Sequence, residues 1–137
     1  MPFISSFIYC DGINMIMTPQ GPKEQLGPQL QAITPIAFPS NYTFSIVCSL
    51  DDLARDKTST IKIQFVDPDG EVLYDTKNID VSPVHTGTEK KVRGIQCNIE
   101  MRNLVFRREG IYATKIFVDD TEIGEYKIKV FAEGERI

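Results

Sequence analysis

The sequence contains no tryptophan, a single histidine and three cysteines in 137 residues. Nucleophilic catalysis by serine or cysteine usually needs a histidine base, and the only candidate, His85, lies in a segment flanked by proline and glycine. Neither the GxGxxG nor the GxxxxGK phosphate-binding motif occurs. These absences predict a protein that is not an enzyme and that needs no cofactor.

The cysteines, Cys10, Cys48 and Cys97, have spacings that match no zinc knuckle and no CxxC motif. A secreted disulfide scaffold would carry a denser and even-numbered set. We therefore expect three small buried thiols in a reducing cytoplasm, with one disulfide plus a free thiol as the alternative. The apolar residues 1–10 lack the basic start of a signal peptide, which also favours a cytoplasmic protein.

No apolar run is long enough to span a membrane, and the net charge of −4 disfavours nucleic acid and anionic lipid as partners. The charges are unevenly placed, because residues 1–50 carry only Asp11, Lys23 and Glu24. This asymmetry predicts that the N-terminal segments are buried at the centre of the fold or against a partner. The length fits one domain, which we place at residues 1–132, followed by a short tail over 133–137.

Short runs rich in Val, Ile, Thr, Tyr and Phe recur between turn residues, as is typical of strands. The clearest alternation runs from Tyr42 to Leu50, and the Asp67-Pro68-Asp69-Gly70 turn predicts a hairpin. Pro35 makes the strand expected at 30–38 an edge or bulged strand. Further strands are expected at 3–9, 60–66, 71–74, 79–84, 91–101, 111–118 and 122–131. This pattern predicts an all-β, antiparallel β-sandwich of the immunoglobulin-like or C2-like type.

Residues 11–28 are rich in proline and glycine and are predicted to form a loop. Within it, Met15, Ile16 and Met17 belong to an apolar island that is either a strand packed into the core or an exposed tip. Methionines on a flexible segment make an adaptable binding surface. These three residues, with Arg107 and Arg108, are the predicted partner-binding residues.

Four aspartates, Asp51, Asp52, Asp119 and Asp120, fall in predicted loops. C2-like sandwiches hold calcium with clustered loop aspartates, which makes these residues weak calcium candidates. A role in the turns explains the same residues, and the spacing of a calcium-binding EF-hand loop is absent. We therefore expect no metal, and keep calcium or phospholipid binding as an alternative function.

The second half of the chain has a distinctive series of segments: IKIQFVDPDGE over 61–71, EGIY over 109–112, FVDD over 117–120 and IGEYKIKV over 123–130. This series resembles a family of small, uncharacterised bacterial and phage proteins, to which no function is assigned. The resemblance covers about residues 1–131 and implies a single immunoglobulin-like or C2-like sandwich without catalytic residues. It also implies a bacterial or phage origin.

The sequence thus predicts a non-enzymatic intracellular module that binds another protein. If phage-encoded, it would act by occluding a host protein. The second alternative is a self-associating structural subunit, in which the charge-poor first 50 residues form the contact between copies.

Overall fold

The computed structural model of the chain describes residues 2–53, 58–81 and 94–132. Over these residues the protein is all-β, which confirms the predicted class. The strands are β1 (Phe3–Cys10), β2 (Ile13–Thr18), β3 (Gly21–Leu26), β4 (Ala32–Ile33), β5 (Ser40–Asp51), β6 (Ser59–Val66), β7 (Val72–Asp75), β8 (Ile79–Val81), β9 (Ile95–Phe106), β10 (Gly110–Val118) and β11 (Thr121–Val130). In the described part of the chain, no helix is long and apolar enough to cross a membrane.

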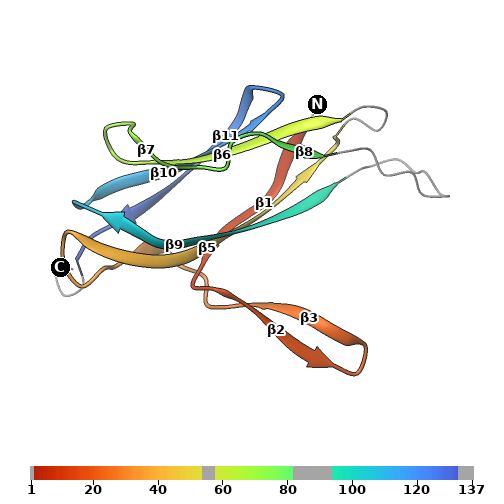
Figure 1. Cartoon of the computed structure of the whole chain (residues 1–137), viewed down its shortest axis with the longest axis horizontal. Helices are drawn as coiled ribbons and strands as arrows, with labels where there is room; N and C mark the ends of the chain where they lie inside the picture. The colour runs from red at the N-terminus through yellow and green to blue at the C-terminus, as the bar shows by residue number, and fades with distance from the viewer. Residues whose placement is uncertain (1, 54–57, 82–93, 133–137) are drawn as a thin grey trace.

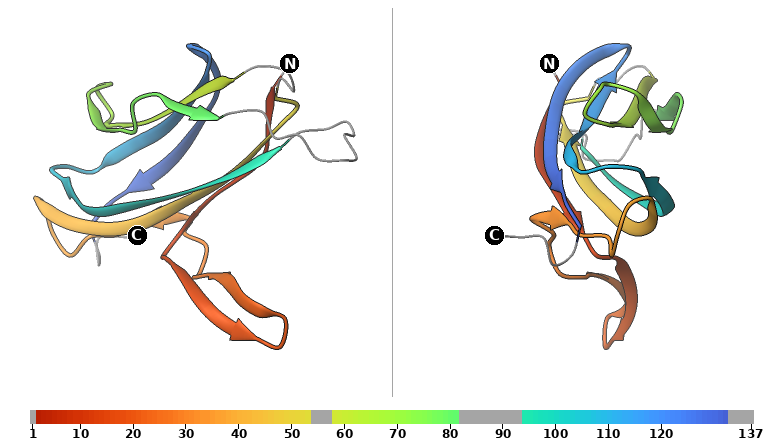
Figure 2. Two further views of the ribbon diagram at one scale, coloured as in Figure 1. Left: turned by 45° about the vertical axis from the view of Figure 1, so that its right-hand side comes forward. Right: turned by 90° about the vertical axis from the view of Figure 1, so that its left-hand side faces the viewer.

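The strands form two larger sheets and a separate hairpin. One sheet has the order β1-β5-β9, and the other has the order β4-β11-β10-β6-β7, with β8 also paired to β6. Strands β2 and β3 pair only with each other among the described strands. The two larger sheets face each other as layers, and the hairpin projects beyond them (Figures 1 and 2).

Side chains from both sheets fill the space between the layers. An aromatic cluster joins Phe44 of β5 to Phe65 of β6, with ring centroids 5.4 Å apart, and includes Phe106 and Tyr112. A second cluster, mostly aliphatic, occupies the other half of the interior and consists of Cys48, Leu50, Leu53, Ile61, Ile63, Ile116 and Val118. The alternating side chains of β5 and β6 therefore supply much of the core, as their patterns predicted.

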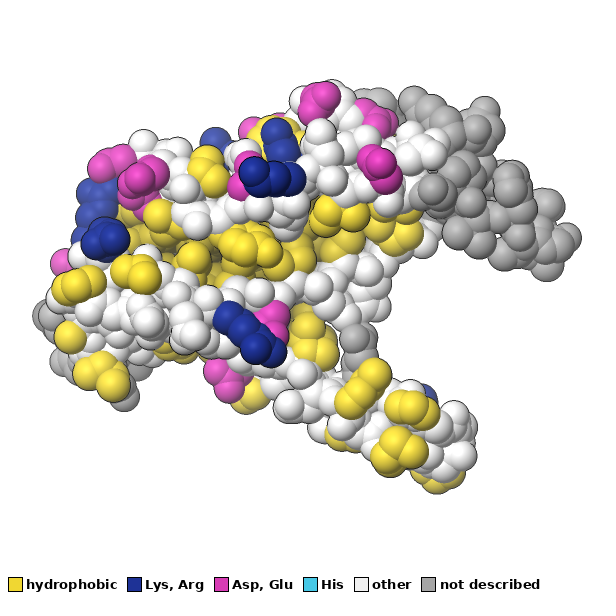
Figure 3. Space-filling model, in the orientation of Figure 1, with side chains coloured by type: hydrophobic (Ala, Val, Ile, Leu, Met, Phe, Trp, Pro, Cys, Tyr) yellow, Lys and Arg dark blue, Asp and Glu magenta, His cyan; other side chains and the backbone are white. Residues whose placement is uncertain are grey.

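The two lateral sides of this two-layered body differ. On one side β1 approaches β11, and the ring of Phe7 stacks on Tyr126 with centroids 4.1 Å apart. On the other side the edge strands β7 and β9 are not paired with each other in the described residues. A hollow lined by apolar side chains runs between the layers there (Figure 3).

Three expectations about the strands need correction. Residues 11–28 are not a loop, because most of them pair as β2 and β3. Of the strand expected at 30–38, only Ala32 and Ile33 pair, and they run parallel to β11, so the sheet is not wholly antiparallel. The strand expected at 91–101 extends instead from Ile95 to Phe106. Residues 82–84, 91–93 and the proposed tail at 133–137 lie outside the described residues.

Candidate functional site

The β2–β3 hairpin arises from turn chemistry in a segment rich in proline and glycine. The Thr18 hydroxyl accepts a hydrogen bond from the backbone N–H of Gln20 (3.2 Å) and donates one to the carbonyl of Gly21 (2.6 Å). Gly21 has φ +110°, a backbone conformation that residues other than glycine rarely adopt. Pro22 can occupy β3 because an edge strand has one side without ladder partners. Proline and glycine here close a tight turn.

The hairpin is amphipathic because paired residues in an antiparallel ribbon point to the same face. Ile13 pairs with Leu26, and Met17 pairs with Pro22. Met15, whose Cα partner is Glu24, lies on the same face; the apolar residues of this face, here called the Met face, are Ile13, Met15, Met17, Pro22 and Leu26. Met15 and Met17 are 67% and 79% exposed.

The opposite face of the hairpin is mainly polar. It carries Asn14 and Thr18 from β2 and Lys23 and Gln25 from β3. Ile16 also lies on this face, 39% exposed. The structure therefore separates Ile16 from Met15 and Met17, with which the sequence had grouped it.

Backbone hydrogen bonds continue the pairing of the two strands at the base of the hairpin, where they join the body. The N–H of Gly27 donates to the carbonyl of Gly12 (2.6 Å), and the N–H of Asp11 donates to the carbonyl of Pro28 (2.9 Å). A Cβ at Gly27 would lie 3.1 Å from the backbone of Gly12, so glycine allows this close approach. The arm is thus a continuation of β1 that extends beyond the sheets, with its Met face outside the core.

The predicted arginines lie at a different place, in the turn between β9 and β10. Arg108 forms ion pairs with Asp69 (2.6 Å) and Asp67 (3.5 Å) of the β6–β7 turn. The hydrogen bond to Asp69 raises the pKa of the Arg108 guanidinium. The backbone carbonyl of Arg108 accepts a hydrogen bond from the Tyr112 hydroxyl (2.7 Å). Arg108 therefore joins two turns of its own chain, and this turn lies well away from the hairpin (Figure 1).

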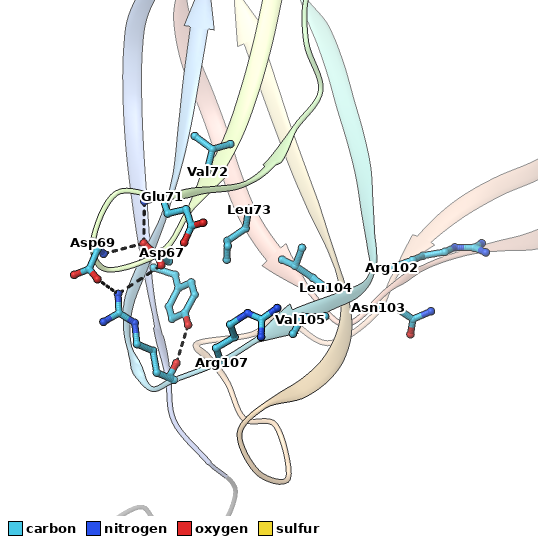
Figure 4. A pocket seen from close by; sticks show the side chains of 12 residues that line it. Asp67, Asp69, Glu71, Val72, Leu73, Arg102, Asn103, Leu104, Val105 and Arg107 are labelled. Carbon is cyan, nitrogen blue, oxygen red and sulfur yellow. Dashed lines mark hydrogen bonds and ion pairs between the residues drawn. The ribbon is translucent and has the colours of Figure 1, made fainter.

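A groove of about 620 Å³ opens beside these ion pairs, between the edge strands β7 and β9 (Figure 4). Leu73 and Leu104 line it and pack against the aromatic core cluster. Arg107 lines the same groove. The groove thus combines apolar walls with charges of both signs.

Of the four aspartates considered for calcium, Asp51 ends β5 and is not in a loop as expected, Asp52 follows it, and Asp119 and Asp120 form the turn between β10 and β11. Asp52, Asp119 and Asp120 all have positive φ, which aspartate tolerates better than most residues. The Asp119 carboxylate accepts a hydrogen bond from the N–H of Thr60 (2.9 Å). Over residues 2–53, 58–81 and 94–132, no three His, Cys, Asp or Glu side chains gather so that they could hold a metal ion. His85 lies outside the described residues.

Comparison with known proteins gives a family. Residues 5–131 match the model of DUF6941, a family of unknown function. The chain belongs to this family. The predicted resemblance to an uncharacterised family is thereby confirmed over most of the chain. We found no match among curated proteins.

Solved structures with a similar fold include one DNA-bound enzyme. It is the alkylpurine DNA glycosylase AlkC of Pseudomonas fluorescens, bound to DNA containing an abasic site analogue. The similarity has a TM-score of 0.50 at 12% identity, and covers 96% of this chain. This chain spans only 30% of the length of the glycosylase chain. At this identity the likeness concerns the fold alone.

Proposed function

We propose that this DUF6941 protein is a non-enzymatic module that binds another protein through the Met face of its hairpin arm. The body would be a single immunoglobulin-like or C2-like β-sandwich in a bacterial cytoplasm, acting by occluding the surface of its partner. The observation that carries the proposal is the arm itself. It presents exposed methionines on one face and polar side chains on the other, outside the hydrophobic core.

Three physical arguments support this reading. A two-stranded hairpin is marginally stable in water by itself, and an apolar face on such a ribbon gains stability when a partner covers it. Full burial of a methionine side chain contributes roughly 1.5–3 kcal/mol, so Met15 and Met17 together supply a sizeable part of the free energy of a moderate complex. Methionine also adapts its shape to the surface it meets.

The test compares two variants, with substitutions on opposite faces of one strand. Met15→Asp combined with Met17→Asp places charges on the Met face, whereas Asn14→Asp places one on the polar face and serves as the matched control. Because these side chains are exposed, we expect all variants to keep the wild-type circular dichroism spectrum and melting temperature. A partner captured from bacterial lysate by wild type and the control, but not by the double variant, is then purified for binding measurements.

With the purified partner, the proposal expects at least a tenfold weaker Kd for the double variant and an unchanged Kd for Asn14→Asp. Equal affinity of all three proteins would refute it. Light scattering tests the competing occupant of the Met face, a second copy of the chain. A wild-type dimer that dissociates on substitution of Met15 and Met17 would favour the self-associating subunit instead.

A further inference from the structure

Two of the three cysteines lie directly opposite each other on neighbouring strands. Cys48 of β5 and Cys97 of β9 are Cα partners in the antiparallel ladder, which is regular from Phe44 to Leu50. Cα atoms of such partners are about 4.5–5.5 Å apart. Disulfides span Cα separations of about 4.4–6.8 Å. A bond between these two sulfur atoms therefore fits the existing backbone.

The two side chains share the inner face of their sheet. Cys48 is fully buried in the aliphatic cluster, and Cys97 is partly buried against the same cluster. Among the described strands, β9 pairs only with β5, so Cys97 lies on an edge strand. A small thiol reagent can reach this edge more readily than it can reach the central strand.

The two thiols of the pair differ in reactivity. The interaction between the two thiols, together with burial, raises the pKa of Cys48. The same interaction lowers the pKa of Cys97. Cys97 is therefore the better nucleophile, because the thiolate is the reactive form. Cys48 would then react in a second step, by attacking the sulfur of Cys97.

Cys10 differs from this pair. Its ladder partner is Ser45, and its thiol donates to the carbonyl of Gly12 (3.5 Å). Burial raises the pKa of Cys10, which disfavours its thiolate. Cys10 thus has no cysteine opposite it, and the three thiols divide into one pair and one isolated residue.

We propose that Cys48 and Cys97 form a reversible disulfide, with glutathione disulfide as the oxidant. The Cys97 thiolate attacks one sulfur of glutathione disulfide, forms a mixed disulfide and releases one glutathione thiolate. Cys48 then transfers its proton to the released glutathione thiolate and attacks the Cys97 sulfur of the mixed disulfide, which releases the second glutathione as a thiolate that takes a proton from water. Two protein thiols are oxidised and one glutathione disulfide is reduced to two glutathiones. The product covalently ties the edge strand β9 to the central strand β5. This site is independent of the Met face.

The experiment equilibrates the whole purified chain in buffers of graded ratio of reduced to oxidised glutathione. Samples are quenched in acid, alkylated under denaturing conditions and measured by mass spectrometry. We expect the oxidised protein to lose two hydrogens in mass and to alkylate at one cysteine, Cys10. Proteolysis should yield a peptide containing Cys48 linked to one containing Cys97. The melting temperature should rise by several degrees and return after reduction, because the cross-link restricts the unfolded chain.

Single variants test the order of the steps. Cys48→Ala should stop at the mixed disulfide, with glutathione retained on Cys97. Cys97→Ala should remain unmodified at Cys48, and Cys10→Ala is the control that should keep the Cys48–Cys97 link. The proposal would be overturned if wild type kept three alkylatable thiols at the most oxidising ratio. A link through Cys10, or glutathione adducts without any link, would also overturn it; these wild-type results do not depend on the folding of any variant.

Discussion

The hydroxyl of Tyr9 on β1 lies 2.7 Å from the hydroxyl oxygen of Thr114 on β10, and this hydrogen bond connects the two sheets. The same Tyr9 hydroxyl donates to the backbone carbonyl of Tyr126 on β11 (2.8 Å), and therefore accepts from Thr114. Thr114 is fully buried. The pair supplies each buried hydroxyl with a partner on the side where β1 approaches β11.

Tyr9→Phe should destabilise the fold. It leaves the Thr114 hydroxyl and the Tyr126 carbonyl without their partner, and a lost buried hydrogen bond costs about 1–3 kcal/mol. Adding Thr114→Val should recover part of this loss, because removal of both polar partners costs less than removal of one. Urea denaturation of both variants measures the effect, with Tyr74→Phe on an exposed position as the control. An unfolding free energy of Tyr9→Phe equal to that of wild type would contradict the prediction.

Stability should also decrease at alkaline pH. Burial raises the pKa of Tyr9, and burial raises the pKa of Tyr112 as well. An unfolded tyrosine ionises near pH 10. Above that pH the unfolded chain loses protons that the folded chain keeps, so the free energy of unfolding falls as the pH rises. Denaturation measured at a series of pH values above 10 should show a smaller fall in the free energy of unfolding for Tyr9→Phe than for wild type. If the free energies of the two proteins fell in parallel, Tyr9 would have no role in the pH dependence.

Asp67 should stabilise the β6–β7 turn through its carboxylate. One oxygen accepts from the N–H groups of Asp69 and Glu71, each at 2.9 Å, while the other faces Arg108. Asp67→Ala removes the carboxylate oxygen that accepts from both backbone N–H groups, and should cost about 1–3 kcal/mol. Asp67→Asn keeps one acceptor oxygen and should cost less. Thermal unfolding ranks the two variants, and equal losses for Asn and Ala would show that charge, rather than the turn hydrogen bonds, decides.

Gly110 should tolerate alanine less well than Gly70. Both have positive φ, +149° and +90°. A Cβ at Gly110 would lie 2.5 Å from Pro68, whereas nothing lies within 4 Å of a Cβ at Gly70. Backbone strain alone costs about 1–3 kcal/mol, and the overlap at Gly110 adds to it. Chemical denaturation should give Gly110→Ala a clearly lower free energy of unfolding than Gly70→Ala. Equal free energies of unfolding would mean that Pro68 moves aside without cost.

Local patterns predicted most of the strands in the body. Alternation over Tyr42 to Leu50 located the central part of β5, and the Asp67–Gly70 turn located the β6–β7 hairpin. Both signals act within a few residues, since side-chain alternation and turn geometry are properties of the local backbone. The hairpin at β2 and β3 was missed because proline and glycine occur both in loops and in tight turns.

The candidate surfaces were predicted only in part. Exposure of Met15 and Met17 depends on the hairpin projecting beyond the sheets, and Arg108 is held by Asp67 and Asp69 from a turn distant in sequence. Local sequence patterns express neither relationship. The grouping of Arg108 with the methionines as one binding surface therefore stays a prediction without geometric support, since the two regions lie apart.

The sequence by itself determined the all-β class and the main strands, because strand periodicity and turn residues are local properties of the chain. Only the tertiary structure decided that Cys48 faces Cys97 and that the Tyr9 hydroxyl meets Thr114. Such pairs join residues far apart in the chain, and their positions follow from the register and stacking of whole sheets. A one-residue change of register would turn every side chain of a strand to the other face, so contacts of this kind exist only once the layers have packed.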